Sequence, residues 1–166
     1  MQPRSPVKLF LLFICLTLPL ASACARDRFD IGLDLGHSQA VIGSGPTFGA
    51  SFGYRAKRYL DLVFNYQSIP HYEMTIASLS ALGRYPLGSR WHLLGRLGIA
   101  NWYESPLGTQ ASIVSSGVDP LVGAGIAYRL SQPLSVRLQY ALILSSNKTG
   151  LGGNFQSLML SVLYHF

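Results

Sequence analysis

Apolar and polar residues alternate with a period of two along most of the chain after residue 28. At the end of the sequence one parity is apolar throughout: Leu158, Leu160, Val162, Tyr164 and Phe166. The other parity includes Ser157, Ser161 and His165. Successive side chains of a β-strand point to opposite faces of a sheet, so this alternation predicts a strand with one apolar and one polar face.

The same pattern recurs in eight stretches of the chain. They cover residues 29–37, 47–55, 59–67, 75–85, 91–104, 121–130, 134–144 and 156–166. A tilted strand crosses a bilayer in about ten residues, which is the length of most of these stretches. Beyond the N-terminus no apolar run approaches the roughly 20 residues that a membrane-spanning helix needs.

The connections between the stretches alternate between short and long. The short ones are residues 56–58, 86–90 and 131–133, and the long ones are 38–46, 68–74, 105–120 and 145–155. Short periplasmic turns and long outer loops are typical of outer-membrane β-barrels.

Aromatic residues gather near the predicted strand ends. Those near the short turns are Tyr54, Tyr59, Tyr85, Trp91, Tyr128, Tyr164 and Phe166, and candidates at the opposite rim are Phe48, Tyr66, Tyr72 and Tyr103. Tyr and Trp favour the membrane interface, because the ring is apolar and its polar tip binds water. A soluble β-sandwich also alternates, but it has no reason to sort its aromatics in this way. We therefore predict an all-β fold, an eight-stranded antiparallel up-and-down transmembrane β-barrel.

The first 25 residues have the features of a signal peptide. Arg4 and Lys8 precede an apolar run over residues 9–20, which is too short to span a membrane, and small residues follow it. Cleavage is expected after Ala23 or Ala25, so that residues 26–166 form the barrel domain.

The two cysteines are not expected to form a disulfide, because Cys15 leaves with the signal peptide. Cys24 stands where a lipoprotein carries its acylated cysteine, and residues 21–24 resemble a lipobox with Ala in place of the usual Leu. Cys24 is therefore a candidate lipidation site, although an ordinary cleavage site also needs small residues here.

Charge restricts the partners of the chain. The formal net charge is +6, and removing Arg4 and Lys8 with the signal peptide lowers it by two, to +4. The remaining basic residues are dispersed along the sequence, so nucleic-acid binding is not expected. We expect a monomer in contact with outer-membrane lipid, located in the outer membrane of a Gram-negative bacterium.

Four segments of the second half carry a family resemblance: residues 83–86 (GRYP), 93–98 (LLGRLG), 120–130 (PLVGAGIAYRL) and 136–140 (VRLQY). They resemble the mid-barrel strands of OmpA-like transmembrane domains. The terminal pattern that ends at Phe166 resembles the C-terminal signal of this class, which implies recognition by the barrel-assembly machinery. We expect no peptidoglycan-binding domain after Phe166, and therefore no cell-wall tethering role.

Nine charged residues share the parity of the polar face: Asp30, Asp34, Arg55, Asp61, Arg84, Arg96, Glu104, Arg129 and Arg137. On the lipid face a charge near mid-bilayer would cost about 2–4 kcal/mol, so we expect these residues in the lumen. Eight strands enclose an interior that side chains can just fill, which predicts a charge network that plugs the barrel. A gated ion path along these charges is the alternative, but wide aqueous channels belong to barrels of about 16 strands.

Candidate catalytic residues are few. Residues 144–147 (LSSN) faintly resemble the Ser-Asn region of outer-membrane lipid A deacylases, but Leu144 stands where that family has its catalytic His. A serine without a nearby base is a weak nucleophile. His37 and Ser38 form a second adjacent pair, with no orienting acid evident in the sequence. The glycine-rich stretch 43–49 lacks the spacing of a dinucleotide-binding loop and is expected to be a mobile outer loop.

The four histidines are isolated in the sequence, so neither a metal site nor a cofactor is expected. We therefore predict a barrel with a structural or surface-interaction role and no catalysis, whose surface partner the sequence does not specify. A lipid-modifying enzyme of the deacylase type is the alternative, and a narrow pore is a third.

Overall fold

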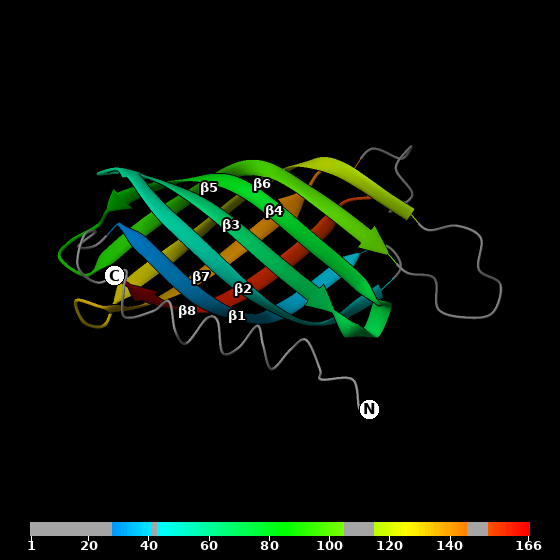
Figure 1. Cartoon of the computed structure of the whole chain (residues 1–166), viewed down its shortest axis with the longest axis horizontal. Coiled ribbons are helices and arrows are strands. Elements are labelled where there is room, and N and C mark those ends of the chain that lie inside the picture. The colour runs from blue at the N-terminus through cyan, green and yellow to red at the C-terminus, as the bar shows by residue number, and fades with distance from the viewer. Residues whose placement is uncertain (1–27, 41–42, 105–114, 146–152) are drawn as a thin grey trace, which may run out of the picture.

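The computed structural model describes residues 28–40, 43–104, 115–145 and 153–166, which form a closed antiparallel β-barrel (Figure 1). Each strand pairs with its neighbours in sequence, and β8 closes the barrel by pairing with β1. The strands are β1 Phe29–Ala40, β2 Gly43–Lys57, β3 Leu60–Ile69, β4 Met74–Pro86, β5 Trp91–Glu104, β6 Ser115–Arg129, β7 Leu134–Ile143 and β8 Phe155–His165. The predicted fold class, an eight-stranded antiparallel barrel, is confirmed.

The two ends of the barrel differ in their connections. The turns from β2 to β3, from β4 to β5 and from β6 to β7 lie at the left end of Figure 1, together with the end of β8. We call this the short-turn end; the backbone N–H of Phe166 donates there to the carbonyl of Phe29 at 2.9 Å. At the opposite, long-loop end, β3 and β4 are joined by a 3-10 turn, η2 Pro70–Tyr72. Glu73 follows this turn with a left-handed φ of 46°.

One expected loop is part of the sheet instead. The sequence predicts an outer loop over residues 43–49, but β2 begins at Gly43 and pairs with β1 from its first residue. Strand propensity depends strongly on pairing context, and here the paired strand overrides the loop-like composition. Gly43 starts β2 with a φ of 143°, which a residue with a side chain rarely adopts.

The faces of the barrel have the polarity expected of a membrane protein. Large apolar side chains cover the outside; Leu33, for example, is 72% exposed and Leu97 66% exposed. Inward positions of the same strands include buried Asp34 and Arg96. None of the helical turns in the described residues is long and apolar enough to be a membrane span.

The interior is layered along the barrel axis. On β5, His92, Leu94, Arg96, Ala100 and Trp102 follow one another from the short-turn end to the long-loop end. Neighbouring strands repeat this order, so a charged mouth, a small apolar layer, a polar layer and a larger apolar cluster succeed one another. The small apolar layer consists of Val63, Leu82 and Leu94, with Ala127 packed against it. The larger apolar cluster consists of Ile69, Met74, Ile76, Ala100, Trp102, Leu121, Ile143 and Phe155.

Candidate functional site: the barrel interior and its basic mouth

Asp34 lies at the centre of the polar layer and is buried. Ser51 donates to its Oδ1 at 3.3 Å, and the Asn65 amide donates to its Oδ2 at 3.1 Å. The three residues come from β1, β2 and β3, whose period-two geometry turns each side chain inward. The carboxylate is therefore held by neutral donors on both oxygens.

Arg96 supplies the main cation of this layer. Its Nε donates to Ser80 Oγ at 2.8 Å, and its Nη2 donates to Asn65 Oδ1 at 2.5 Å and to Ser78 Oγ at 3.0 Å. Asn65 thus bridges the guanidinium of Arg96 to the carboxylate of Asp34. The predicted attraction between opposite charges acts here through an amide instead of a direct ion pair.

Arg137 is the second buried cation of the layer. Its Nη2 donates to Ser51 Oγ at 3.4 Å, and its Nε has no hydrogen-bond partner among the described residues. Ser51 therefore links Arg137 to Asp34 in the way that Asn65 links Arg96 to it.

Direct ion pairs occur in the mouth at the short-turn end. Arg84 forms an ion pair with Asp61 and lies 3.8 Å from Asp30, from its Nη2 to the Oδ2. Arg55 Nε lies 3.8 Å from Asp61 Oδ1. Nearby, Ser135 Oγ and His165 Nε2 are hydrogen-bonded at 2.7 Å. The strand ends thus concentrate the charged groups at the place where the barrel opens.

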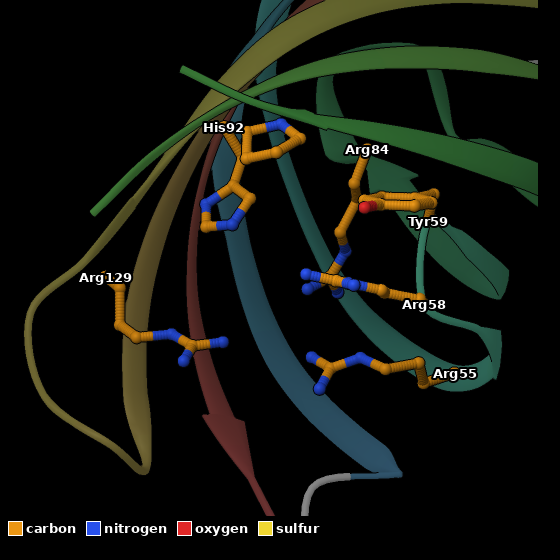
Figure 2. A pocket seen from close by; sticks show the side chains of 7 residues that line it. Arg55, Arg58, Tyr59, Arg84, His92 and Arg129 are labelled. Atoms are coloured by element: carbon orange, nitrogen blue, oxygen red, sulfur yellow. The ribbon is translucent and has the colours of Figure 1, made fainter. Parts of the chain in front are cut away.

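A cavity of about 170 Å³ opens in this mouth. Its lining consists of Arg55, Arg58, Tyr59, Arg84, Pro86, His92 and Arg129. Figure 2 shows the guanidinium groups of the four arginines directed toward a common space. The cavity is therefore strongly basic.

Arg90 lies at the same end but outside this cavity. In the turn between β4 and β5, it donates from Nη1 to the Tyr128 hydroxyl at 3.3 Å. This hydrogen bond raises the pKa of the Arg90 guanidinium, which stays protonated.

The nine charged residues predicted in the lumen fall into three groups. Asp30, Asp34, Asp61, Arg96 and Arg137 are buried inside the barrel. Arg55, Arg84 and Arg129 are half-buried at the mouth. Glu104 ends β5, but its side chain lies outside the described part of the chain, as do Cys24 and both candidate cleavage sites.

The five residues of the predicted assembly signal lie along β8 and just after it. Leu158, Leu160, Val162 and Tyr164 are on the outer face. The Phe166 ring packs edge-on against Tyr164 with 5.0 Å between the ring centroids. Recognition by the assembly machinery stays a prediction.

Asp119 is an inward charged residue that was not predicted from the sequence. It is buried and accepts a hydrogen bond from Trp102 Nε1 at 2.8 Å. The sequence places the start of this strand at residue 121, whereas β6 begins at Ser115, six residues earlier. Asp119 has the same parity as Leu121, so extending the alternation past Pro120 would have placed its carboxylate inside.

The candidate catalytic pairs do not form a site in the described residues. His37 is exposed and Ser38 is buried, because adjacent strand residues point to opposite faces. Ser38 Oγ instead accepts a hydrogen bond from Thr47 Oγ1 at 2.6 Å. Ser145 is buried, and residues 146–147 lie outside the described residues. No group of three or more potential metal ligands occurs in the part of the chain that the structure describes.

The fold is that of a small outer-membrane β-barrel. It is closed and eight-stranded, with an apolar outer face, a polar layer inside and aromatic residues near its rims. The chain belongs to the OmpA-like transmembrane domain family, whose family model matches residues 46–166. The resemblance found in the second half of the sequence is thereby confirmed, and the match begins further upstream. Membership identifies the chain as an outer-membrane protein.

Individual relatives are distant. Outer membrane protein A of Serratia marcescens is 28% identical over 154 residues, which cover 77% of this chain and 43% of that protein. The chain therefore spans less than half the length of this relative. The N-terminal β-barrel domain of Pseudomonas aeruginosa OprF has a TM-score of 0.67 at 15% identity and covers 82% of this chain and 97% of that chain. Neisserial surface protein A has a TM-score of 0.60 at 20% identity, covering 83% and 97% respectively. At these identities the structural matches show the fold alone.

Proposed function

We propose that this protein is a closed, non-conducting outer-membrane barrel with a structural or surface-interaction role and no catalytic activity. The observation that carries the proposal is the filled interior, in which two apolar layers enclose a hydrogen-bonded polar layer. Eight strands leave an interior just wide enough for side chains, so filling it removes the space for a water column.

The apolar cluster supports closure at the long-loop end. Trp102 and Ala100 are 0% exposed, and Ile69 and Met74 are 1% exposed. An ion that crossed this layer would lose most of its hydration shell among apolar side chains, and such desolvation costs several kcal/mol or more. A passage for ions would therefore require the cluster to move apart.

The polar layer supports closure at mid-barrel. Arg96 spans the interior from β5 to Asn65 on β3, and Arg137 approaches from β7. Two guanidinium groups facing one carboxylate also oppose the entry of cations.

The absence of catalysis is supported by the position of the candidate pairs. His37 and Ser38 lie on opposite faces of β1, so the histidine cannot act as base for that serine. Surface interactions would involve the long connections, of which residues 105–114 and 146–152 lie outside the described residues. We also propose that the barrel is monomeric and that its β8 residues are read by the assembly machinery.

Planar-bilayer recording tests the closed barrel. We expect no channel activity from the wild type or from Arg96→Ala, because the apolar cluster remains intact, and measurable conductance only from the double variant Trp102→Ala/Arg96→Ala. Ile99→Ala on the outer face is the matched control and should stay silent. Steady wild-type conductance that changes with Arg96→Ala would refute the proposal and favour the narrow pore.

Catalysis is tested separately by mass spectra of lipid A from cells with and without the protein. We expect identical spectra. A loss of one acyl chain would establish the deacylase alternative.

A further inference from the structure

The mouth at the short-turn end holds more positive charge than its own carboxylates balance. Arg55 and Arg84 contact Asp61, and Arg84 also lies near Asp30. Among the described residues no carboxylate lies within ion-pair distance of Arg58 or Arg129, which line the same cavity. Four guanidinium groups thus face one space (Figure 2), and the carboxylates of Asp30 and Asp61 lie within ion-pair distance of only two of them. An anion would complete the charge balance.

An apolar groove lies next to this cavity on the outer wall of the barrel. It has a volume of about 330 Å³ and is lined by residues that include Tyr59, Gly83, Tyr85, Leu93 and Gly95. Gly83 and Gly95 are register partners on β4 and β5, and both occupy outward positions. A Cβ at Gly95 would meet nothing within 4 Å, so the glycine leaves open space that strand packing does not require.

The cavity and the groove are adjacent, because Tyr59 and Arg84 line both of them. Tyr85 is exposed on the outer face, and Tyr59 is exposed in the turn between β2 and β3. Aromatic residues near strand ends mark the interface between lipid headgroups and acyl chains. The guanidinium carbon of Arg58 lies 5.2 Å from the centroid of the Tyr59 ring. A cation therefore stands beside an apolar groove at the aromatic rim of the barrel.

We propose that this mouth and groove bind one anionic phospholipid from the periplasmic leaflet. Its phosphate occupies the basic cavity near Arg58 and Arg129, and one acyl chain lies in the groove over Gly83 and Gly95. Basic residues at the membrane surface attract anionic lipids, and the short turns of such barrels face the periplasm. A soluble phosphate would use only the cavity, whereas the adjoining groove favours a lipid.

Trp91 provides a local reporter for the test. It is half-exposed on the outer face of β5, two residues before Leu93, which lines the groove. The second tryptophan, Trp102, is buried inside the barrel and serves as an internal reference. Brominated acyl chains quench only tryptophan that they touch, so they should quench Trp91 and leave Trp102 unchanged.

The full chain is refolded into phosphatidylcholine vesicles that contain a minor fraction of brominated phosphatidylglycerol or, for comparison, brominated phosphatidylcholine. We expect several-fold stronger quenching by the anionic lipid. Loss of one arginine should weaken binding about fivefold, so Arg58→Gln/Arg129→Gln should reduce quenching to the phosphatidylcholine level. Lys57→Gln, an exposed rim cation outside the cavity, is the control and should have little effect. A boiling-dependent shift on SDS gels confirms that each variant is folded.

Two further measurements distinguish a lipid phosphate from a soluble phosphate. Gly95→Leu fills the groove and should reduce quenching by phosphatidylglycerol, while inorganic phosphate in solution should not compete. Competition by inorganic phosphate with no effect of Gly95→Leu would mean a soluble anion and would overturn the lipid assignment. An equal loss of quenching in Lys57→Gln and in the double arginine variant would show that binding depends only on the general positive charge of the rim and not on a defined site. Chemical cross-linking of two copies through the groove would assign it to a dimer interface and likewise overturn the proposal.

Discussion

Replacing Arg96 with Met removes the main cation of the polar layer and leaves its volume nearly filled. The wild-type guanidinium donates three hydrogen bonds, to Ser80, Asn65 and Ser78. Methionine is unbranched and adapts to irregular interior space, so the variant tests the lost polar contacts with little cavity formation.

The expected magnitude follows from two opposing effects. Hydrogen bonds to a charged group contribute about 1.5–3 kcal/mol each, and the variant loses all three of them. Removing the cation also relieves its desolvation cost, which amounts to several kcal/mol for a buried ion. Breaking a buried charged network from one side commonly costs 3–5 kcal/mol, because the remaining groups stay buried, and we expect a loss of about that size. Asn65 Oδ1 and the carboxylate of Asp34 are the groups left without the positive charge.

Urea titration of the protein in phospholipid vesicles measures this loss, with the fraction folded read from boiling-dependent mobility on SDS gels. Arg90→Met is the control, since Arg90 is exposed in the turn between β4 and β5 and its hydrogen bond to Tyr128 is open to solvent. It should change the free energy of unfolding by about 0.5 kcal/mol or less. Asp34→Asn in the Arg96→Met background should cost less than Asp34→Asn alone, because the two groups share Asn65. A loss below about 1 kcal/mol for Arg96→Met, together with additive double variants, would refute the network.

Two smaller perturbations test the other layers. Trp102→Phe removes the indole donor from the buried carboxylate of Asp119 and should lower the free energy of unfolding by about 1–3 kcal/mol, with part of the loss recovered by adding Asp119→Asn; an unchanged urea midpoint would contradict the hydrogen bond. Gly98→Ala places a Cβ against the backbone carbonyl of Leu79 and should cost about 1–3 kcal/mol, whereas Gly95→Ala on the same strand meets nothing and should be nearly neutral. Equal urea midpoints for the two alanine variants would show that β4 and β5 are not packed as described.

The strands themselves were predictable because alternation is a local property of the sequence. For β5 both predicted ends coincide with the observed ones, and β8 differs by one residue at each end. The start of β2 was missed, because Gly and Pro lower local strand propensity and the pairing that compensates comes from β1. The same effect at Pro120 hid the first residues of β6 and with them Asp119.

The layering of the interior was not predictable from alternation alone. The period of two separates inside from outside, but it says nothing about the order of inward residues along the barrel axis. Ile69, Ile76 and Ile143 are apolar inward residues, and the cluster joins them to residues of β5, β6 and β8. Only the register of all eight strands brings them together at the long-loop end.

For the charged residues, too, parity predicts which face of a strand a side chain occupies, and register determines which residues it meets. Parity placed Asp34, Arg96 and Arg137 on one face, and register decides that neutral Asn65 and Ser51 stand between the opposite charges. Apolar layers lie on either side of this group, so most of its polar atoms bond to one another, while the Nε of Arg137 has no partner among the described residues. A polar layer enclosed in this way depends on matched donors and acceptors. The mouth, which is open to water, can leave Arg58 and Arg129 without a carboxylate, and this difference in solvent access makes the mouth the place where an external anion can bind.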